Sequence, residues 1–329
     1  MAIYEMNMAI SETIFAPSTQ ALTIAILILP QASILEVAST LDPLRSANRH
    51  LGSEVYRWRI VSPDGAAVPL TCGIELPASG RLVAAADADA LIVIAGYRQS
   101  EMATAPLLRN LSRMAFRFRA IGGIDAGGWV LARAGLLRGH RATVHWEDLE
   151  DFAAAHPETD VVPDRYVIDR NRFTAGGASP AADLMLHLIR ARNGPALALQ
   201  VAASFLTTAR EGGEAQTVAA TPDPRLDIRV AQAIARMEAA LDTPQTVVAL
   251  AAAVGLTARH LETLFQQNVA MTPGAYGLTL RLAAARRMIT DTRHPLADVA
   301  LRSGFSSASS LSRAFRRQYG HAPSALRKR

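Results

Sequence analysis

Residues 122–129 (GGIDAGGW) combine the residue types that present one side chain on a tight turn. Small residues on both sides of a single polar residue favour a nucleophile elbow, in which that residue stands between a strand and the N-terminus of a helix. The presented residue would be Asp125. About twenty residues further on, after a glycine turn at Gly139, the segment 141–146 (RATVHW) adds a histidine and a tryptophan.

The chemistry of this segment favours binding over catalysis. A carboxylate at neutral pH attacks amides poorly compared with a thiolate held beside a histidine. The sole cysteine, Cys72, lies in a different segment, and a lone cysteine usually behaves as a small packing residue. A carboxylate with a neighbouring indole suits a cationic nitrogen, through charge and through cation–π attraction of roughly 0.5 to 2 kcal/mol.

We therefore predict that Asp125, His145 and Trp146 bind a small molecule. Two of them have a structural alternative. Trp146 could fill the core, and His145 could be a hydrogen-bonded structural histidine. We predict no cofactor and no metal, because the eight histidines lack paired ligand spacing and the glycines match neither a P-loop nor G-x-G-x-x-G.

The elements that would position these residues alternate between strand and helix. Short apolar runs predict buried strands at 22–29, 59–61, 91–95 and 120–124, and helical patterns lie at 34–49, 105–117, 129–137 and 180–192. This order predicts a flavodoxin-like, doubly wound parallel sheet that binds its ligand at the carboxyl ends of the strands. A closing helix at 196–210 would precede a Gly-, Thr- and Pro-containing linker.

The last hundred residues contain one pattern twice. LAAAVGLT at 250–257 recurs as VALRSGFS at 299–306, and each copy leads into a helical segment that ends on Phe265 or Phe315. A small alanine lets two helices cross closely, a glycine supplies the turn, and a hydroxyl at Thr257 or Ser307 can cap the second helix. Each copy therefore predicts a helix-turn-helix, and together they make the C-terminal region an all-α domain.

The two units would act on one DNA duplex. A connecting helix over residues 273–290 would hold the two recognition helices roughly one DNA turn, about 34 Å, apart. Charge supports this interpretation: residues 223–329 carry 15 Lys and Arg against 7 Asp and Glu, whereas residues 1–222 carry 19 against 22. Clustered basic residues on one domain are typical of phosphate binding.

Helix phase gives candidate DNA contacts. On the exposed faces we predict contacts to bases from Arg259, His260, Thr263, Ser309, Ser310 and Arg313, and contacts to phosphate from Arg316 and Arg317. Arginine is the side chain best suited to guanine. Any single exposed arginine on such a helix could equally be solvated.

These motifs resemble known families. Residues 226–329 resemble the DNA-binding domain of the AraC/XylS family, through both repeats, Thr272-Pro273 and Gly320-His321-Ala322-Pro323. The elbow and the later ATVHW segment resemble the ThiJ/PfpI superfamily, in which the elbow residue is a cysteine. That superfamily contributes an acid from the segment after the first strand, so the resemblance implies Glu36 as a fourth ligand-binding residue, although Glu36 could equally be a solvated helix residue. Their fusion is similar to GlxA-type regulators, as are the stretches 41–49, 131–137, 162–166 and 183–189.

The resemblance implies a ligand-responsive, sequence-specific transcription regulator, and we expect an activator. Its implied partners are promoter DNA, a small-molecule inducer such as an amino acid or quaternary amine, RNA polymerase and a second copy of the chain. The alternative is an amidohydrolase-like enzyme with a DNA-binding appendage. We expect an N-terminal extension (1–20), a sensing and dimerisation domain (21–210), a linker (211–224) and a DNA-binding domain (225–329).

Composition sets the remaining limits. The longest apolar run, residues 21–30, is shorter than the roughly 20 residues that a membrane span needs, and no basic leader precedes it. One cysteine cannot form an internal disulfide, which is consistent with a reducing compartment. We therefore expect a cytoplasmic protein that does not contact the membrane.

Overall fold

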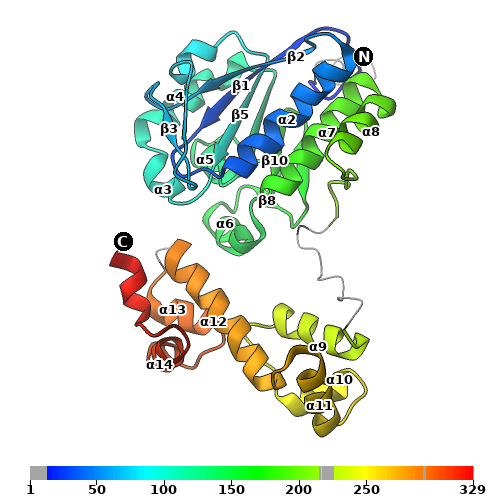
Figure 1. Ribbon diagram of the computed structural model, residues 1–329. Coiled ribbons are helices and arrows are strands. Elements are labelled where there is room, and N and C mark those ends of the chain that lie inside the picture. The colour runs from blue at the N-terminus through cyan, green and yellow to red at the C-terminus, as the bar shows by residue number, and fades with distance from the viewer. Residues whose placement is uncertain (1–12, 215, 217–225, 292–293, 329) are drawn as a thin grey trace. The chain divides into compact units, whose positions relative to one another are not determined.

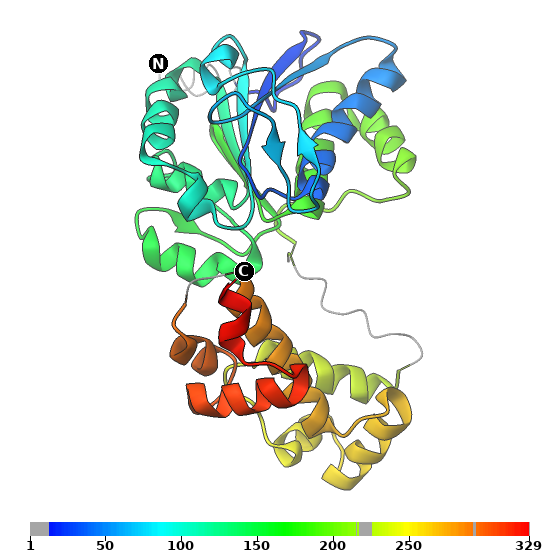
Figure 2. The same ribbon diagram turned by 60° about the vertical axis from the view of Figure 1, so that its left-hand side comes forward.

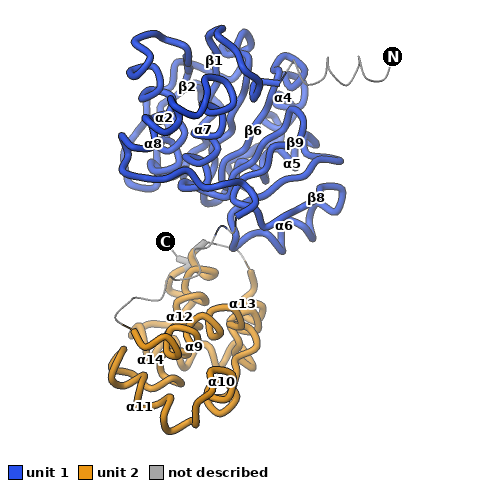
Figure 3. The backbone as a smooth tube through the Cα atoms, turned by 90° about the vertical axis from the view of Figure 1, so that its right-hand side faces the viewer, with its two compact units in different colours: residues 1–216 blue, residues 217–329 orange. Residues whose placement is uncertain are grey.

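Two compact units make up the chain, Met1–Gln216 and Thr217–Arg329 (Figure 3). The computed structural model describes residues 13–214, 216, 226–291 and 294–328. Residues 1–12 of the predicted N-terminal extension lie outside the described residues, as do residues 215 and 217–224 of the predicted linker. The boundary between the units falls at 216/217, within the segment 211–224 that we expected to be a linker.

The first unit is built on a six-stranded sheet. Its order is β2 (Tyr56–Val61), β1 (Leu22–Ile28), β5 (Ala90–Ala95), β6 (Ala120–Asp125), β10 (Arg172–Ala175) and β9 (Tyr166–Asp169). The first five strands are parallel, which confirms the doubly wound fold. Neither β9 nor β10 was predicted, and β9 is antiparallel to β10. The two residues between them turn the chain tightly, with Arg170 at a φ of 56°.

Helices cover both faces of this sheet (Figure 1). On one face lie α2 (Ile34–Leu51), α7 (Ala178–Asn193) and α8 (Pro195–Ser204). The other face carries α4 (Ala105–Met114) and α5 (Gly127–Arg133). Successive residues of a strand point to opposite faces, so in β1 Ile24 and Ile26 enter one core while Ala25 and Leu27 enter the other. Burial on both faces explains the continuous apolar runs of the sequence.

Shorter elements complete the first unit. Two small two-stranded sheets pair β3 (Val68–Pro69) with β4 (Glu75–Leu76) and β7 (Arg141–Ala142) with β8 (Asp160–Val161). The remaining helical pieces are η1 (Leu82–Ala85), α3 (Gln99–Met102), η2 (Ala115–Arg117), η3 (Trp146–Asp148) and α6 (Leu149–Ala155). The predicted closing helix over 196–210 ends early, at Ser204, because the chain turns there with Leu206 at a φ of 53°.

The described residues of the second unit form helices and the turns that join them, as predicted. Its helices are α9 (Ile228–Ala239), α10 (Val247–Ala253), α11 (Ala258–Val269), α12 (Pro273–Asp291), α13 (Leu296–Arg302), α14 (Ala308–Tyr319) and η4 (Pro323–Lys328). They form two small cores, one under α9 to α11 and one under α13 and α14. Helix α12 contributes Tyr276 to the first core and Leu282 to the second, so it joins them (Figure 2).

Among the described residues, no single helix is long and apolar enough to cross a membrane. The bent pair α10 and α11 meets that length and composition test only when its two helices are taken together.

Candidate ligand site and nucleic-acid interface

The predicted elbow forms at the end of β6. Asp125 is the last residue of the strand and adopts a φ of 54°, a conformation that non-glycine residues other than Asn and Asp rarely adopt. Two glycines let α5 begin directly after it. A side chain at Gly127 would collide with the backbone oxygen of Val93, and one at Gly128 would lie 2.6 Å from Val144 Cγ1. The glycines are therefore required by close packing, and the strained turn holds the carboxyl group of Asp125 in place.

Glu36 reaches the same place from the first turn of α2. Ser33 caps this helix, and the Oε2 atom of Glu36 accepts the Ser33 backbone N–H at 3.4 Å. The side chain is only 7% exposed. Burial, and next the negative charge of Asp125, raise the pKa of Glu36 to about 9. At neutral pH, Glu36 therefore keeps its proton, and its side chain is hydrogen-bonded to Asp125, whose own pKa is also raised by burial.

His145 and Trp146 follow β7 and bring a base and an aromatic ring. Burial raises the pKa of Asp125, and the nearby His145 ring opposes that rise. His145 Nδ1 accepts the backbone N–H of Glu147 at 3.4 Å, which orients the ring. The ring of Trp146 is 42% exposed and lies 5.8 Å from the His145 ring. Trp146 therefore does not fill the core, which was the structural alternative for this residue.

The structure adds one acid that the sequence did not suggest. Burial, and then the charge of Asp125, raise the pKa of Asp148 to about 6. Asp148 ends the short helix η3, and its sequence neighbourhood gives no signal for such a role. Glu36, Asp125 and His145 therefore interact as one group, here called the elbow site, with Asp148 coupled to it and the exposed Trp146 beside it. Such a group has an excess of acid and an available aromatic face, which suits a cationic ligand.

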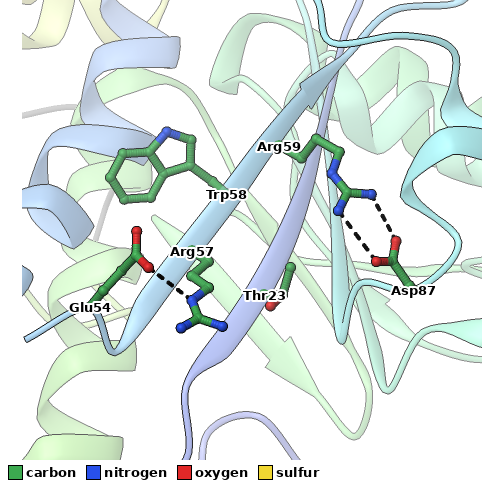
Figure 4. A pocket seen from close by; sticks show the side chains of 6 residues that line it. All are labelled: Thr23, Glu54, Arg57, Trp58, Arg59 and Asp87. Atoms are coloured by element: carbon green, nitrogen blue, oxygen red, sulfur yellow. Dashed lines mark hydrogen bonds and ion pairs between the residues drawn. The ribbon is translucent and has the colours of Figure 1, made fainter.

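A shallow groove on β2 lies among different residues (Figure 4). Its two arginines are already paired: Arg57 with Glu54 at 3.0 Å, and Arg59 with Asp87 at 2.8 Å. None of the four predicted ligand residues lines it. The groove therefore offers paired surface charges and gives no support for a second ligand site.

Both predicted helix-turn-helix units form in the second unit of the chain. Helices α10 and α11 cross at 87°, close to the angle usual for this motif. Ala251 and Ala300 are buried at the crossings, and Gly255 and Gly304 make the turns with φ values of 72° and 73°. The predicted caps are confirmed. Thr257 Oγ1 accepts the His260 N–H at 3.3 Å, and Ser307 Oγ accepts the Ser310 N–H at 3.2 Å.

The two recognition helices correspond position by position from these caps, with Leu261 and Phe265 buried in α11 and Leu311 and Phe315 buried in α14. Most of the predicted DNA contacts are exposed, namely Arg259, His260, Thr263, Ser309, Arg313, Arg316 and Arg317. Ser310 differs: its hydroxyl donates to the Ser307 backbone oxygen at 2.8 Å and accepts the Ser307 N–H at 3.2 Å. Its hydroxyl therefore holds the start of the helix.

Charge separates the two recognition helices. Arg313, Arg316 and Arg317, together with Ser312, line a hollow on the surface of α14. In α11 the exposed face carries Arg259 and the acidic Glu262, so it has no excess positive charge. Ser312 and Glu262 lie on these helices beside the predicted DNA contacts and were not among them.

Other basic residues of this unit brace its helices. The Arg281 guanidinium of α12 lies 4.3 Å from the Phe305 ring centroid, and its Nε donates to the Ser303 backbone oxygen at 3.0 Å. Arg286 lies over Tyr319 at 5.1 Å. These contacts fix α12 against the second helix-turn-helix, so part of the positive charge of the domain is structural.

An α/β unit followed by a paired helix-turn-helix unit defines a DNA-binding transcription regulator. A family model described as DJ-1/PfpI matches residues 22–191, and one described as a helix-turn-helix domain matches residues 250–329. The chain is 36% identical to the HTH-type transcriptional regulator CdhR of Pseudomonas aeruginosa, over 91% of this chain and 89% of CdhR. It is 29% identical to the HTH-type transcriptional regulator GlxA of Rhizobium meliloti, over 93% of this chain and 95% of GlxA.

A solved structure gives the same result for part of the chain. An AraC family transcriptional regulator from Pseudomonas putida is 30% identical, with a TM-score of 0.51, and the match covers 56% of this chain and all of that one. The chain therefore belongs to the GlxA-type transcription regulators, which join a DJ-1/PfpI unit to an AraC-type helix-turn-helix domain.

Proposed function

We propose that this regulator senses a small cationic metabolite, an amino acid or a quaternary amine, at the elbow site and activates transcription in response. The observation that carries the proposal is the buried Glu36 carboxyl, which keeps its proton and is hydrogen-bonded to Asp125 beside His145. A ligand cation would compensate the charge of Asp125, and the exposed Trp146 ring would cover it. The site lies at the carboxyl ends of the strands, where doubly wound sheets bind ligands.

The DNA-binding unit would read two adjacent major grooves through α11 and α14. Arg259 and Arg313 would contact bases, while Arg316 and Arg317 would contact phosphates. Among the described residues none of these four guanidinium groups is held in an ion pair, which leaves them available to DNA. We further propose that the regulator acts in the cytoplasm as a homodimer and recruits RNA polymerase at its promoter.

Ligand and DNA would be linked through two states of the protein. The inducer must bind the DNA-competent state more tightly than the resting one, since equal affinity shifts no population.

Thermal stabilisation of the purified chain tests the ligand class. The three tryptophans, Trp58, Trp129 and Trp146, all belong to the first unit, so their fluorescence follows its unfolding alone. In a panel of amino acids, betaines, carnitine and polyamines, a ligand at 100 times its Kd should add about 2.7 kcal/mol. Asp125→Asn should abolish the stabilisation, and Arg313→Ala should retain it. Stabilisation by anionic compounds alone would contradict a cation site.

The alternative, an amidohydrolase-like enzyme, lacks a suitable nucleophile. The elbow position holds Asp125, and the exposed Cys72 belongs to a different segment. Turnover of amide substrates by the purified chain, lost in Asp125→Ala or Cys72→Ser, would favour this alternative.

A further inference from the structure

The chain that leaves the first unit stays bound to it before it reaches the second. After α8, the Arg210 N–H donates to Asp183 Oδ1 at 3.0 Å. The backbone oxygens of Gly212 and Glu214 then accept the Arg165 N–H, at 2.8 and 3.1 Å. We call residues 210–214 and 216 the strap. Residues 211–214 and 216 of the segment that composition assigns to a linker are therefore attached to the first unit.

A buried ion pair lies beneath the strap. Arg165 is 2% exposed, and its Nη2 and Nε atoms donate to Asp183 Oδ2 at 2.6 and 2.9 Å. Its Nη1 atom donates to the backbone oxygen of Gln216 at 3.3 Å. A buried guanidinium needs a full set of acceptors, because each N–H left unpaired costs desolvation energy. The strap completes this set, which makes its attachment specific.

Gln216 is the last anchor before the chain leaves the unit. Its Nε2 atom lies within hydrogen-bond distance of the Val144 backbone oxygen at 2.8 Å, Thr143 Oγ1 at 2.8 Å and the Asp164 backbone oxygen at 2.9 Å. Its Oε1 atom is buried and accepts no hydrogen bond from the described residues. A buried amide whose nitrogen is hydrogen-bonded and whose oxygen is not carries the desolvation cost of that oxygen. A modest change nearby can therefore release the side chain.

Gln216 contacts the segment that carries His145. Val144 directly precedes His145, and its backbone oxygen accepts the hydrogen bond from Gln216. The Cγ1 atom of Val144 packs against Gly128 at the start of α5. The segment 143–145 therefore has the elbow site on one side and the strap anchor on the other. A ligand that repositions His145 would move the oxygen that holds Gln216.

We infer that the strap couples the elbow site to the DNA-binding unit: occupancy of the site changes how firmly the strap is held and so how much chain separates the two units. This inference rests on the proposed ligand site. Release from residue 210 to residue 216 would add seven residues to that separation, at most about 25 Å of reach. A longer connection changes the effective concentration of one DNA-binding unit beside another.

Adjacent glycines in the strap provide a matched pair of variants. A Cβ at Gly212 would lie 2.7 Å from the Tyr166 backbone oxygen, whereas one at Gly213 meets nothing within 4 Å. Gly212→Ala should displace the strap and Gly213→Ala should not. Gly176→Ala supplies an independent displacement, because its Cβ would occupy the position of the Gln216 amide.

Cleavage of the full chain by a glutamate-specific protease measures strap release. We expect Gly212→Ala and Gly176→Ala to be cut after Glu211 and Glu214 at least tenfold faster than the wild type, and Gly213→Ala within twofold of it, since such cleavage follows the population of the open form. Equal rates in Gly212→Ala and Gly213→Ala would show that the strap is not held.

Two further readouts test the coupling. Asp125→Asn, which weakens the attraction of His145 to the elbow, should raise the strap cleavage rate at least threefold; an unchanged rate would refute communication from the site. In a promoter reporter, Gly212→Ala should change basal expression at least fivefold relative to Gly213→Ala. Equal expression would refute a regulatory role even if the strap is released. Since none of these measurements uses a ligand, their outcome is separate from that of the ligand screen.

Discussion

Glu36→Gln should stabilise the first unit, and the gain should grow with pH. The unfolded chain ionises Glu36 near its ordinary pKa of 4.5, whereas the folded unit holds the proton up to about pH 9. Below pH 4.5 both states are protonated and Glu36 costs nothing. Between these values stability falls with rising pH, by about 1.4 kcal/mol per unit, because only the unfolded state gains by ionising. The loss at pH 7 is on the order of 3 kcal/mol.

A glutamine at this position has the shape of the protonated acid. Its amide can donate to Asp125, and its oxygen can accept the Ser33 N–H, so the contacts of Glu36 are preserved. Urea unfolding followed by tryptophan fluorescence at pH 5, 6, 7 and 8 measures the difference between the variant and the wild type. We expect it to be below about 1 kcal/mol at pH 5 and about 3 kcal/mol at pH 7.

Glu150→Gln is the matched control, since Glu150 is exposed on α6 and should show no comparable dependence on pH. A Glu36→Gln variant that is destabilised, or whose gain does not change with pH, would show that Glu36 is ionised in the folded protein. The interpretation of the elbow site as a proton-sharing pair would then be wrong.

Three further outcomes concern the DNA-binding unit. Arg313→Ala should relax base preference and cost about 1 to 3 kcal/mol on operators with the matching guanine; uniform weakening across base-substituted operators would make it a phosphate contact. Arg316→Ala should weaken all sequences alike and lower the slope of log affinity against log salt by about 1, while Arg57→Ala in the first unit should leave the slope unchanged. Gly304→Ala should lower the free energy of unfolding more than Gly255→Ala does. Both turns have positive φ, but only Gly304 packs against neighbouring backbone; equal losses in thermal unfolding would contradict this packing.

The sequence by itself determined the features that depend on local pattern. The helix-turn-helix units follow from a small alanine four residues before a glycine and a capping hydroxyl two or three residues after it, and all three lie within a few residues of one another. The elbow at Asp125 could be predicted for the same reason, because the glycines that this turn requires lie next to Asp125 in the sequence. The parallel sheet was predictable from buried runs that both faces of the sheet require.

Only the tertiary structure decided which distant groups meet. No local sequence signal places Glu36 of α2 beside Asp125 of β6. Yet the hydrogen bond between these two side chains helps to raise the pKa of Glu36 and defines the elbow site. Composition assigned the strap to a linker, and it is bound because Arg165 needs acceptors and Gln216 finds three. Gly255 and Gly304 have nearly the same φ, and Gly212 and Gly213 are adjacent, yet a Cβ would meet backbone atoms only at Gly304 and Gly212. That difference depends on the fold as a whole. Local propensity fixes the elements, whereas the partners of buried polar groups are chosen by packing.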